Sequence, residues 1–322
     1  MDKQQEKRPL VILTGPTAVG KSSLSIALAK KTGGEIISAD SMQVYRGMDI
    51  GSAKISTEEM EGVPHHLIDV LDPTEPFDVT VFQRLAKEAA EGIWERGHLP
   101  IVVGGTGFYI QALLYDVDFR SEARDEELRC RLEERALEIG PEALHGELKV
   151  IDPESAEAIP AGNVKRVIRA IEFYHLTGEK ISAHNHAQRE RTSPYAFRYF
   201  VLTDERSKLY ERIDRRVDQM MEEGLVEEVK RLRRSGVRIT DTSMQGLGYR
   251  EIYRYLEGEL TKEEALRLIK QNTRHYAKRQ LTWFRRERDV IWLAKQEFDY
   301  DKQRILAEML GRISEITGRN DN

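Results

Sequence analysis

The residues with the clearest chemical purpose form a glycine-rich turn near the start of the chain. Four apolar residues typical of a buried parallel strand precede this turn, and a helical pattern follows it. In such a turn, backbone N–H groups converge on phosphate oxygens, a lysine adds positive charge and a serine hydroxyl can bind Mg²⁺. The turn fits the pattern G-x-x-x-x-G-K-[ST] and consists of Gly15, Pro16, Thr17, Ala18, Val19, Gly20, Lys21, Ser22 and Ser23. The sequence therefore predicts a phosphate loop, with Ser22 as the ligand of Mg²⁺.

A carboxylate follows the second predicted strand. Residues 35–39 are mostly apolar, and Asp40 comes directly after them. Loops beyond the carboxyl ends of the strands line the ligand crevice of an α/β sheet, so Asp40 is positioned to act as a base or to bind Mg²⁺. The alternative is a structural role for Asp40, as the cap of a turn or of a helix.

A second glycine-rich turn follows the third predicted strand, residues 100–103. In P-loop ATPases this strand, or one near it, usually ends in an acidic residue that holds Mg²⁺ and helps to position water. Here the strand runs into a Gly-Gly-Thr loop, residues 104–106, which lacks such an acid. This substitution predicts a site that binds phosphates with few means of hydrolysing them. The N–H groups of the loop and the hydroxyl of Thr106 would suit a departing pyrophosphate.

Length and composition restrict the class of protein. The chain has 322 residues, of which 40% are hydrophobic and 33% charged, enough apolar material for one large or two moderate domains. No apolar run approaches the roughly 20 residues that span a bilayer, and the first residues lack the apolar stretch of a signal peptide. The single cysteine, Cys130, excludes an intrachain disulfide and leaves the histidines without thiolate partners for zinc. We expect a cytoplasmic protein without membrane association and, because no dimer seam is evident, a monomer.

The elements that must position these groups alternate between strand and helix patterns, which predicts an α/β fold with a parallel sheet. Between residues 121 and 195 only helical patterns occur, together with a polar stretch at 182–194 that we expect to be mobile. We therefore predict a P-loop NTPase-like core formed by residues 1–120 and 196–322, in which helices flank the sheet. Residues 121–195 are predicted to form an inserted α-helical domain.

Three smaller predictions follow from local patterns. Residues 46–80, which include the adjacent His65 and His66, are expected to form an irregular surface loop. Asp204 is expected to cap the long helical stretch that follows it. The segment from residue 262 to residue 288 is expected to begin as a helix with a capping box, because Thr261 directly before it and Glu264 have the required spacing.

This segment, called the basic segment below, has nine lysines and arginines against three glutamates, although the whole chain has a net charge of −5. Its cations alternate with Tyr276, Trp283 and Phe284. Cations bind phosphates and aromatic rings can stack on unpaired bases, so the pattern suits RNA. The alternative is that the aromatic residues belong to the core. A local excess of positive charge on an acidic protein predicts a polyanionic partner at one face.

Taken together, six blocks of the sequence resemble the family of tRNA dimethylallyltransferases, also called tRNA isopentenyltransferases. The blocks are spread from residue 10 to residue 286 and read GPTAVGKSS, ADSMQVYRGMDIGSAK, VVGGTGFYI, NVKRVIRAIEFY, QGLGYREI and YAKRQLTWFRR. The resemblance implies transfer of a dimethylallyl group from dimethylallyl diphosphate to N6 of the adenosine 3′ of the anticodon, position 37 of tRNA. The products would be N6-isopentenyladenosine and pyrophosphate. It also implies Mg²⁺ as cofactor, the anticodon stem-loop as partner, and a phosphate loop of the ATP-binding type that holds the diphosphate.

The resemblance also implies roles for individual residues. Asp40 corresponds to the general base that removes a proton from the adenine amine, and Thr106 and Arg129 correspond to contacts on the leaving group. Lys165 stands where the family pattern Gln-Arg-x-x-Arg has glutamine. The tRNA-contacting residues would be Asp40, Ser41, Met42, Gln43, Lys165, Arg166, Arg169, Gln245, Gly248, Tyr249, Lys278, Arg279, Trp283 and Arg285. Solvated surface is the alternative for Arg166 and Arg169. The inserted domain and the basic segment are expected to hold the stem-loop from two sides.

Three other functions use some of the same features. The phosphate loop alone favours a kinase that uses ATP to phosphorylate a small molecule or a nucleotide. An isopentenyltransferase acting on free adenine nucleotides would use the same donor site but leaves the basic segment without a partner. A nucleotide-switched RNA-binding protein would require neither a base at Asp40 nor the loss of the hydrolytic acid.

Overall fold

The chain forms two compact units. The computed structural model describes residues 7–119 and 125–318. Met1–Leu114 and Pro194–Asn322 form the first unit, and Tyr115–Ser193 form the second. The sequence analysis expected boundaries at 121 and 195, of which the first lies outside the described residues.

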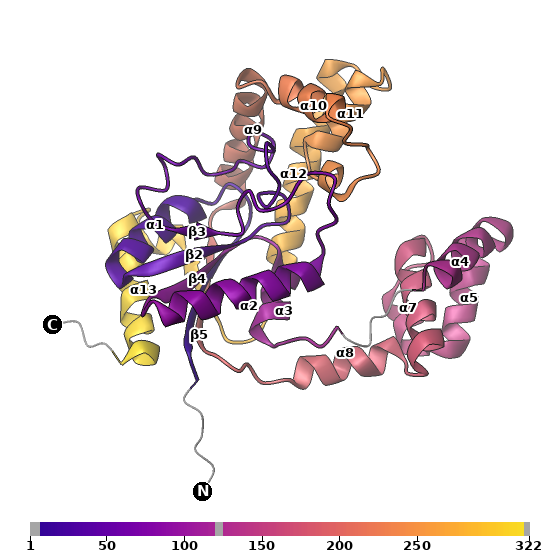
Figure 1. The fold of residues 1–322 in the computed structure, drawn as a ribbon, viewed down its shortest axis with the longest axis horizontal. Helices are drawn as coiled ribbons and strands as arrows, with labels where there is room; N and C mark the ends of the chain where they lie inside the picture. Colours follow the sequence, from indigo (N-terminus) through magenta and orange to yellow (C-terminus); the bar gives the residue numbers. More distant parts are fainter. Residues whose placement is uncertain (1–6, 120–124, 319–322) are drawn as a thin grey trace, which may run out of the picture. The chain divides into compact units, whose positions relative to one another are not determined.

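The first unit contains a six-stranded sheet in the order β3-β2-β4-β1-β5-β6, and all of its pairings are parallel (Figure 1). The central strands are almost wholly buried, because a parallel sheet with helices on its faces requires continuous apolar runs. The predicted α/β class is thus confirmed. The strands are β1 (Pro9–Thr14), β2 (Gly34–Ala39), β3 (His65–His66), β4 (Leu99–Gly104), β5 (Ala196–Thr203) and β6 (Val290–Ala294).

Helices cover this sheet and extend beyond it. Alternation along β1 directs Val11 and Leu13 toward the face covered by α1 and α13, which lie side by side (Figure 1). Helix α2 packs on β2 and β4. The helices of this unit are α1 (Lys21–Thr32), α2 (Val79–Glu95), α3 (Gly107–Leu114), α9 (Arg206–Glu222), α10 (Leu225–Arg234), η1 (Thr242–Gln245), α11 (Tyr249–Leu256), α12 (Lys262–Phe284), η2 (Lys295–Phe298) and α13 (Lys302–Thr317).

The second unit is helical and has its own apolar core, to which Leu132, Leu148 and Ile171 contribute. Its helices are α4 (Glu126–Ile139), α5 (Pro141–Ile151), α6 (Pro153–Ala158), α7 (Val164–Thr177) and α8 (Ile181–Glu190). Most of the polar stretch at 182–194, which was expected to be mobile, falls within α8. Buried Asp152 accepts hydrogen bonds from the backbone N–H and the hydroxyl of Ser182, at 3.0 and 2.8 Å, and so fixes the first turn of this helix.

Local patterns predicted some of the remaining features and missed others. The capping box formed by Thr261 and Glu264 at the start of α12 is confirmed. Asp204, in contrast, is not the cap of α9. Its buried carboxylate accepts a hydrogen bond from Arg212 at 2.5 Å, whereas Glu205 occupies the capping position. The segment around His65 and His66 is irregular apart from β3, which pairs with β2 at the edge of the sheet.

This edge strand is held by a buried carboxylate, that of Glu35 on β2. Its side chain is 3% exposed and accepts two hydrogen bonds from Arg96, at 2.9 and 2.8 Å. The rings of His66 and His98 each lie 2.6 Å from one of its oxygens. The hydrogen bonds from Arg96, more than any other cause, lower the pKa of Glu35 to about 2. Glu35 therefore joins β2, β3 and the turn before β4 through its negative charge.

Replacement of Glu35 by glutamine should remove this stabilisation. A carboxylate with a lowered pKa stabilises the fold above its unfolded pKa, and the contribution disappears as the pH falls toward the folded value. We expect Glu35→Gln to reduce the free energy of unfolding by roughly 3 kcal/mol at pH 7 and by much less at pH 3, as measured by urea unfolding. Glu91→Gln, at an exposed carboxylate paired with Arg8, is the control and should cost under about 0.5 kcal/mol. A Glu35 effect of equal size at both pH values would contradict this account.

Candidate active site

Three loops meet at one edge of the sheet because the strands that lead into them end in register. Thr14 at the end of β1 pairs with Gly104 at the end of β4, and Gly104 pairs with Ala39 at the end of β2. A Cβ atom on Gly104 would lie 2.1 Å from the carbonyl oxygen of Ala39, so only glycine fits there. The phosphate loop, Asp40 and the Gly-Gly-Thr loop therefore begin side by side.

The phosphate loop curls tightly before α1 begins at Lys21. Gly15 has a φ of +146°, and a Cβ atom on it would lie 2.2 Å from the carbonyl oxygen of Leu202 on β5. The ammonium group of Lys21 bends back over the loop and donates to the carbonyls of Gly15 and Pro16, at 3.0 and 2.9 Å. Burial, and next the charge of Arg216, lower the pKa of Lys21 to about 8. An anion bound in the loop would favour the charged form of this lysine.

Asp40 has a structural contact and also faces the phosphate loop. Its carboxylate accepts hydrogen bonds from the backbone N–H groups of Met42 and Gln43, at 2.8 and 3.3 Å, and so caps the turn after β2. Burial raises the pKa of Asp40, against the opposing effects of these hydrogen bonds and of the charge of Lys21. A raised pKa makes this carboxylate a better proton acceptor than an exposed aspartate.

Lys21 and Asp40 both line a cavity of about 750 Å³. It is lined by Asp40 and Gln43, by Arg216 of α9, and by the phosphate-loop residues Thr17, Ala18, Gly20, Lys21, Ser22 and Ser23. The structure thus brings together the predicted phosphate site and the predicted base. Among the described residues, no three His, Cys, Asp or Glu side chains are grouped as a metal site. A Mg²⁺ ion bound to a diphosphate and to the Ser22 hydroxyl would not require such a group.

Arg216 is a functional candidate that the sequence analysis missed. Its side chain is open to the cavity, and desolvation lowers its pKa. Arg212, one turn earlier on α9, donates to the carbonyl of Ala18 at 2.9 Å, so this helix face lies against the phosphate loop. The spacing of four residues between the two arginines was the available signal, but other arginines nearby in the same helix obscured it.

Thr106 lies where the Gly-Gly-Thr loop enters α3. Its backbone N–H donates to the carbonyl of Ala39 at 3.3 Å, which ties it to the strand that leads to Asp40. Its hydroxyl oxygen is shielded from solvent, makes no hydrogen bond of normal geometry among the described residues and interacts with the side chain of Tyr276. Thr106 is not among the residues that line the cavity. Tyr276 of α12 is nearby, and burial, followed by the charge of Asp40, raises its pKa to about 12.

The loop at residues 245–249 combines exposed and buried residues. Gly246 packs closely against Met42, because a Cβ atom on it would lie 2.7 Å from the Met42 sulfur. Gln245 is exposed, whereas Gly248 and Tyr249 are buried. The hydroxyl of Tyr249 donates to Glu228 at 2.7 Å. The predicted role of Tyr249 as an RNA contact is therefore corrected, because this side chain is part of the protein interior.

Glu228 of α10 also holds the loop at residues 49–51, part of which lines the cavity. Its buried carboxylate accepts hydrogen bonds from the backbone N–H groups of Asp49, Ile50 and Gly51, at 3.0, 3.0 and 3.1 Å. Asp49 and Ile50 line the cavity. A carboxylate far along the chain thus fixes a loop that no local pattern in the sequence could place.

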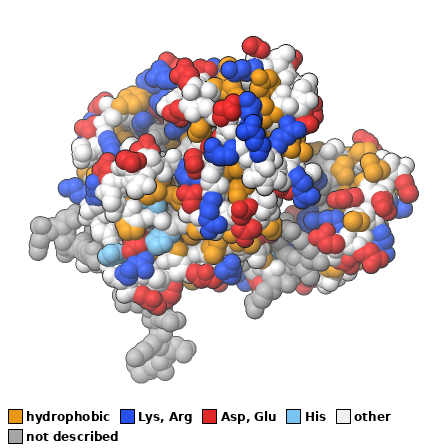
Figure 2. Space-filling model, turned by 45° about the horizontal axis from the view of Figure 1, so that its top comes forward, with side chains coloured by type: hydrophobic (Ala, Val, Ile, Leu, Met, Phe, Trp, Pro, Cys, Tyr) orange, Lys and Arg blue, Asp and Glu red, His pale blue; other side chains and the backbone are white. Residues whose placement is uncertain are grey.

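The basic segment presents cations on one side of α12. Lys278, Arg279 and Arg285 are exposed, Trp283 is half-buried against Gly107, and Phe284 belongs to the core. A hollow of about 380 Å³ on this side is lined by His275, Lys278, Arg279, Thr282, Trp283 and Arg286. Figure 2 shows Lys and Arg side chains gathered in the upper centre of the view, bordered by hydrophobic ones.

The other predicted site residues belong to the second unit. Arg129 and Arg169 both contact the fully buried carboxylate of Glu172, at 2.7 and 3.3 Å. Lys165 and Arg166 are exposed at the start of α7. The structure therefore joins Arg129 and Arg169 through a single acidic residue, a link that sequence analysis did not predict.

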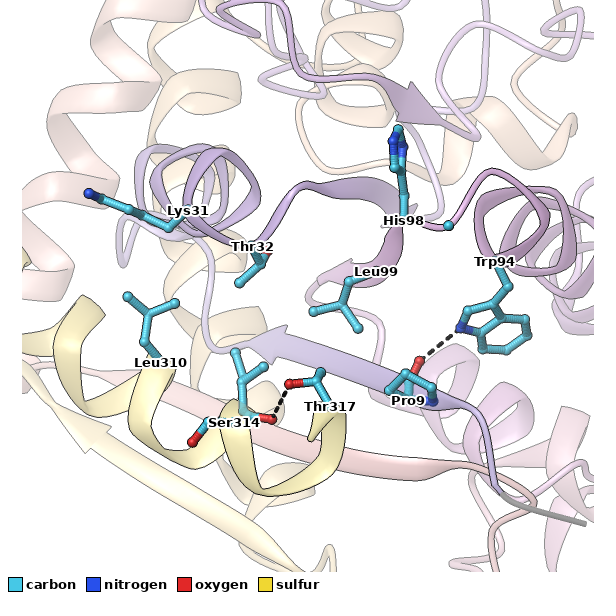
Figure 3. Close-up of a pocket in the computed structure, with 11 residues that line it drawn as sticks. Pro9, Lys31, Thr32, Trp94, His98, Leu99, Leu310, Ser314 and Thr317 are labelled. Atoms are coloured by element: carbon cyan, nitrogen blue, oxygen red, sulfur yellow. Dashed lines mark hydrogen bonds between the residues drawn. The ribbon is translucent and has the colours of Figure 1, made fainter. Parts of the chain in front are cut away.

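A second cavity, of about 280 Å³, lies at the amino ends of β1 and β4, opposite the edge with the loops (Figure 3). The indole of Trp94 donates to the carbonyl of Pro9 at 2.9 Å, and Thr317 and Ser314 donate to carbonyls of their own helix. These three polar groups already have backbone partners and are not free to bind a phosphate.

Within the described ranges, no helix is long and apolar enough to span a bilayer.

Comparison with known proteins identifies the family of this chain. Family models for IPP transferase and for isopentenyl transferase match residues 43–287 and 9–71. The tRNA dimethylallyltransferase of Lachnoclostridium phytofermentans is 58% identical over 96% of this chain and 98% of its own length. That of Geobacillus thermodenitrificans is 54% identical over 88% of this chain and 89% of its own.

Solved structures give the same result. A tRNA isopentenylpyrophosphate transferase from Bacillus halodurans has a TM-score of 0.72 and 48% identity, over 98% of this chain and 99% of its own. A eukaryotic dimethylallyltransferase acting on tRNA has a TM-score of 0.80 and 31% identity, over 96% and 80%. The chain belongs to the tRNA dimethylallyltransferase (IPP transferase) family.

Proposed function

We propose that this chain transfers a dimethylallyl group from dimethylallyl diphosphate to N6 of adenosine 37 in tRNA, giving N6-isopentenyladenosine and pyrophosphate. The observation that carries the proposal is the cavity in which Asp40 and Lys21 of the phosphate loop lie together. A phosphate cradle beside a carboxylate with a raised pKa suits a reaction in which a diphosphate leaves carbon while a base accepts a proton.

The proposed reaction is a single nucleophilic substitution at carbon. N6 of the adenine attacks C1 of the dimethylallyl group, the C1–O bond breaks, and its electron pair leaves with pyrophosphate. Asp40 accepts the proton that N6 loses. The N–H groups of the phosphate loop, Lys21 and Arg216 would stabilise the negative charge on the leaving group. The Ser22 hydroxyl would help to hold Mg²⁺, which would supply further positive charge.

The glycines that end β4 support transfer over hydrolysis. An acidic residue at that position would activate water, which would compete with the adenine for the allylic carbon. The Gly-Gly-Thr loop has no such acid, and we assign Thr106 as a contact on the leaving group, as the family resemblance implies. Its hydroxyl is shielded from solvent beside Tyr276. The resemblance implies the same role for Arg129, whose guanidinium donates to Glu172 within the second unit.

The polyanionic partner of the basic segment would be the anticodon stem-loop, whose target base must leave the stack to reach an enclosed site. Lys278, Arg279, Trp283 and Arg285 supply phosphate and stacking contacts on α12, and Lys165 and Arg166 supply exposed cations on α7. All of these groups come from one chain, so we propose a monomer. Because the substrate is tRNA, we propose that it acts in the cytoplasm.

Incubation with radiolabelled dimethylallyl diphosphate and Mg²⁺ tests the reaction directly. We expect label in unmodified tRNA, and none in AMP or in a reaction without acceptor. Label in AMP alone would instead identify an enzyme that modifies free nucleotides. Absence of label in both acceptors, together with ADP formation from ATP, would identify a kinase.

A substitution at Asp40 can separate its structural role, the cap of the turn at Met42, from its proposed role as the base. Asparagine keeps the oxygen that caps Met42 but cannot accept the proton, so Asp40→Asn should keep tRNA affinity within twofold and reduce kcat by about 10²–10⁴-fold. The kcat/KM of the native chain should fall as the pH drops through the raised pKa of Asp40. This acidic decrease should be absent from the pH profile of the variant. Glu61→Gln, at an exposed carboxylate lining the same cavity, is the control and should retain activity. Turnover near the native value in Asp40→Asn would refute the assigned base.

Charge reversal on α12 tests the RNA interface. The double variant Arg279→Glu, Arg285→Glu should weaken tRNA binding and flatten its dependence on salt. Binding releases counterions from the phosphates that the protein contacts, so fewer are released when contacts are lost. Binding isotherms at several KCl concentrations should show a slope of log Kd against log salt that is lower by about 1 for each lost contact. The matched control reverses two exposed arginines elsewhere, Arg84 and Arg312, with the same change in net charge. Equal slopes in both variants would refute a specific interface.

A further inference from the structure

The side chain of Gln280, on α12, lies between two loops of the site and is 5% exposed. Its Oε1 accepts a hydrogen bond from the backbone N–H of Thr17, and its Nε2 donates to the carbonyl of Gly105, both at 2.9 Å. Thr17 belongs to the phosphate loop and Gly105 to the Gly-Gly-Thr loop. One amide group therefore joins the loops that follow β1 and β4.

This bridge lies just beyond the end of the strand pairing. The ladder between β1 and β4 ends where Thr14 faces Gly104. A Cβ atom on Gly105 would lie 2.1 Å from Nε2 of Gln280 and 3.6 Å from the carbonyl oxygen of Gly15, so the loops and the amide are closely packed. Beyond the last pair of β1 and β4, the distance between the phosphate loop and the Gly-Gly-Thr loop thus depends on a side chain of α12, which is distant in sequence.

A buried glutamine is often only a satisfied polar group of the core. Gln83 of α2 is an example, because it is buried and donates to the carbonyl of Ala112 at 2.7 Å, away from the site. Gln280 differs because both backbone groups to which it hydrogen-bonds belong to loops that carry proposed binding groups, whereas Tyr276, with which it also interacts, lies on its own helix. Thr17 lines the cavity, and the residue after Gly105 is Thr106.

We propose that Gln280 is a positioning residue that sets the distance between the phosphate loop and Thr106, so that both loops bind the same diphosphate group. Gln280 does not touch the diphosphate. It stabilises the arrangement of donors before the ligand arrives, which spares the ligand the cost of ordering them. The inference rests on the proposed function only for the assignment of Thr106 to the diphosphate.

A double-mutant cycle on the full-length chain tests this role, with inorganic pyrophosphate and Mg²⁺ as the probe in calorimetric titrations. Gln280→Met has similar length but makes neither hydrogen bond, and Thr106→Val removes a buried hydroxyl that makes no hydrogen bond of normal geometry among the described residues. We expect Gln280→Met to weaken pyrophosphate binding about tenfold in the native background but less than threefold beside Thr106→Val. Gln83→Met is the matched control and should change the affinity less than twofold.

The same factor in both backgrounds, or no effect of Gln280→Met, would overturn the proposal. If Gln280→Met does not fold, Gln280→Glu replaces it, because glutamate can still accept from Thr17 but cannot donate to Gly105. Native affinity in that variant would also overturn the proposal. The readout does not require prenyl transfer, so a chain that binds pyrophosphate but leaves tRNA unmodified would refute the proposed function and leave this test intact.

Discussion

The register of three parallel strands is the constraint on which the rest of the site depends. Because β2, β4 and β1 end level with one another, the loops that carry Asp40, Thr106 and the phosphate-binding residues leave the sheet at the same edge. Gly104 makes this possible, since any side chain there would collide with the carbonyl of Ala39 and force the strands apart. A one-residue slip between β2 and β4 would move Asp40 away from the phosphate loop and reverse which side chains face the helices.

The electrostatics of the cavity indicate the charge of its ligand. Burial lowers the pKa of Lys21 and raises that of Asp40, so both groups are held in surroundings that disfavour their charged forms. Arg216 adds a second partly desolvated cation on the same wall. An anion carrying more than one charge would relieve the repulsion between the two cations, whereas a neutral ligand would not.

Local features of the sequence predicted the parts of the fold that short-range physics controls. The phosphate loop, the buried strands and the capping box of α12 depend on residues within a few positions of one another. Arg216, Glu228 and Gln280 could not be found in this way, because each acts on a loop more than a hundred residues away. Asp204 and Tyr249 were misjudged for the same reason: their roles follow from tertiary contacts that outweigh local patterns.

The place of the second unit in the chain has a consequence for synthesis on the ribosome. Strand β1 ends at Thr14, but its partner β5 begins only at Ala196, after the whole helical unit. The nascent chain can pair β1 with β4 early, yet the other edge of β1 stays open until the helical unit has been translated. The helical unit has a core of its own and can fold during this interval. The last third of the chain then closes the sheet, so a truncated product would retain an exposed apolar edge suited to aggregation and to recognition by chaperones.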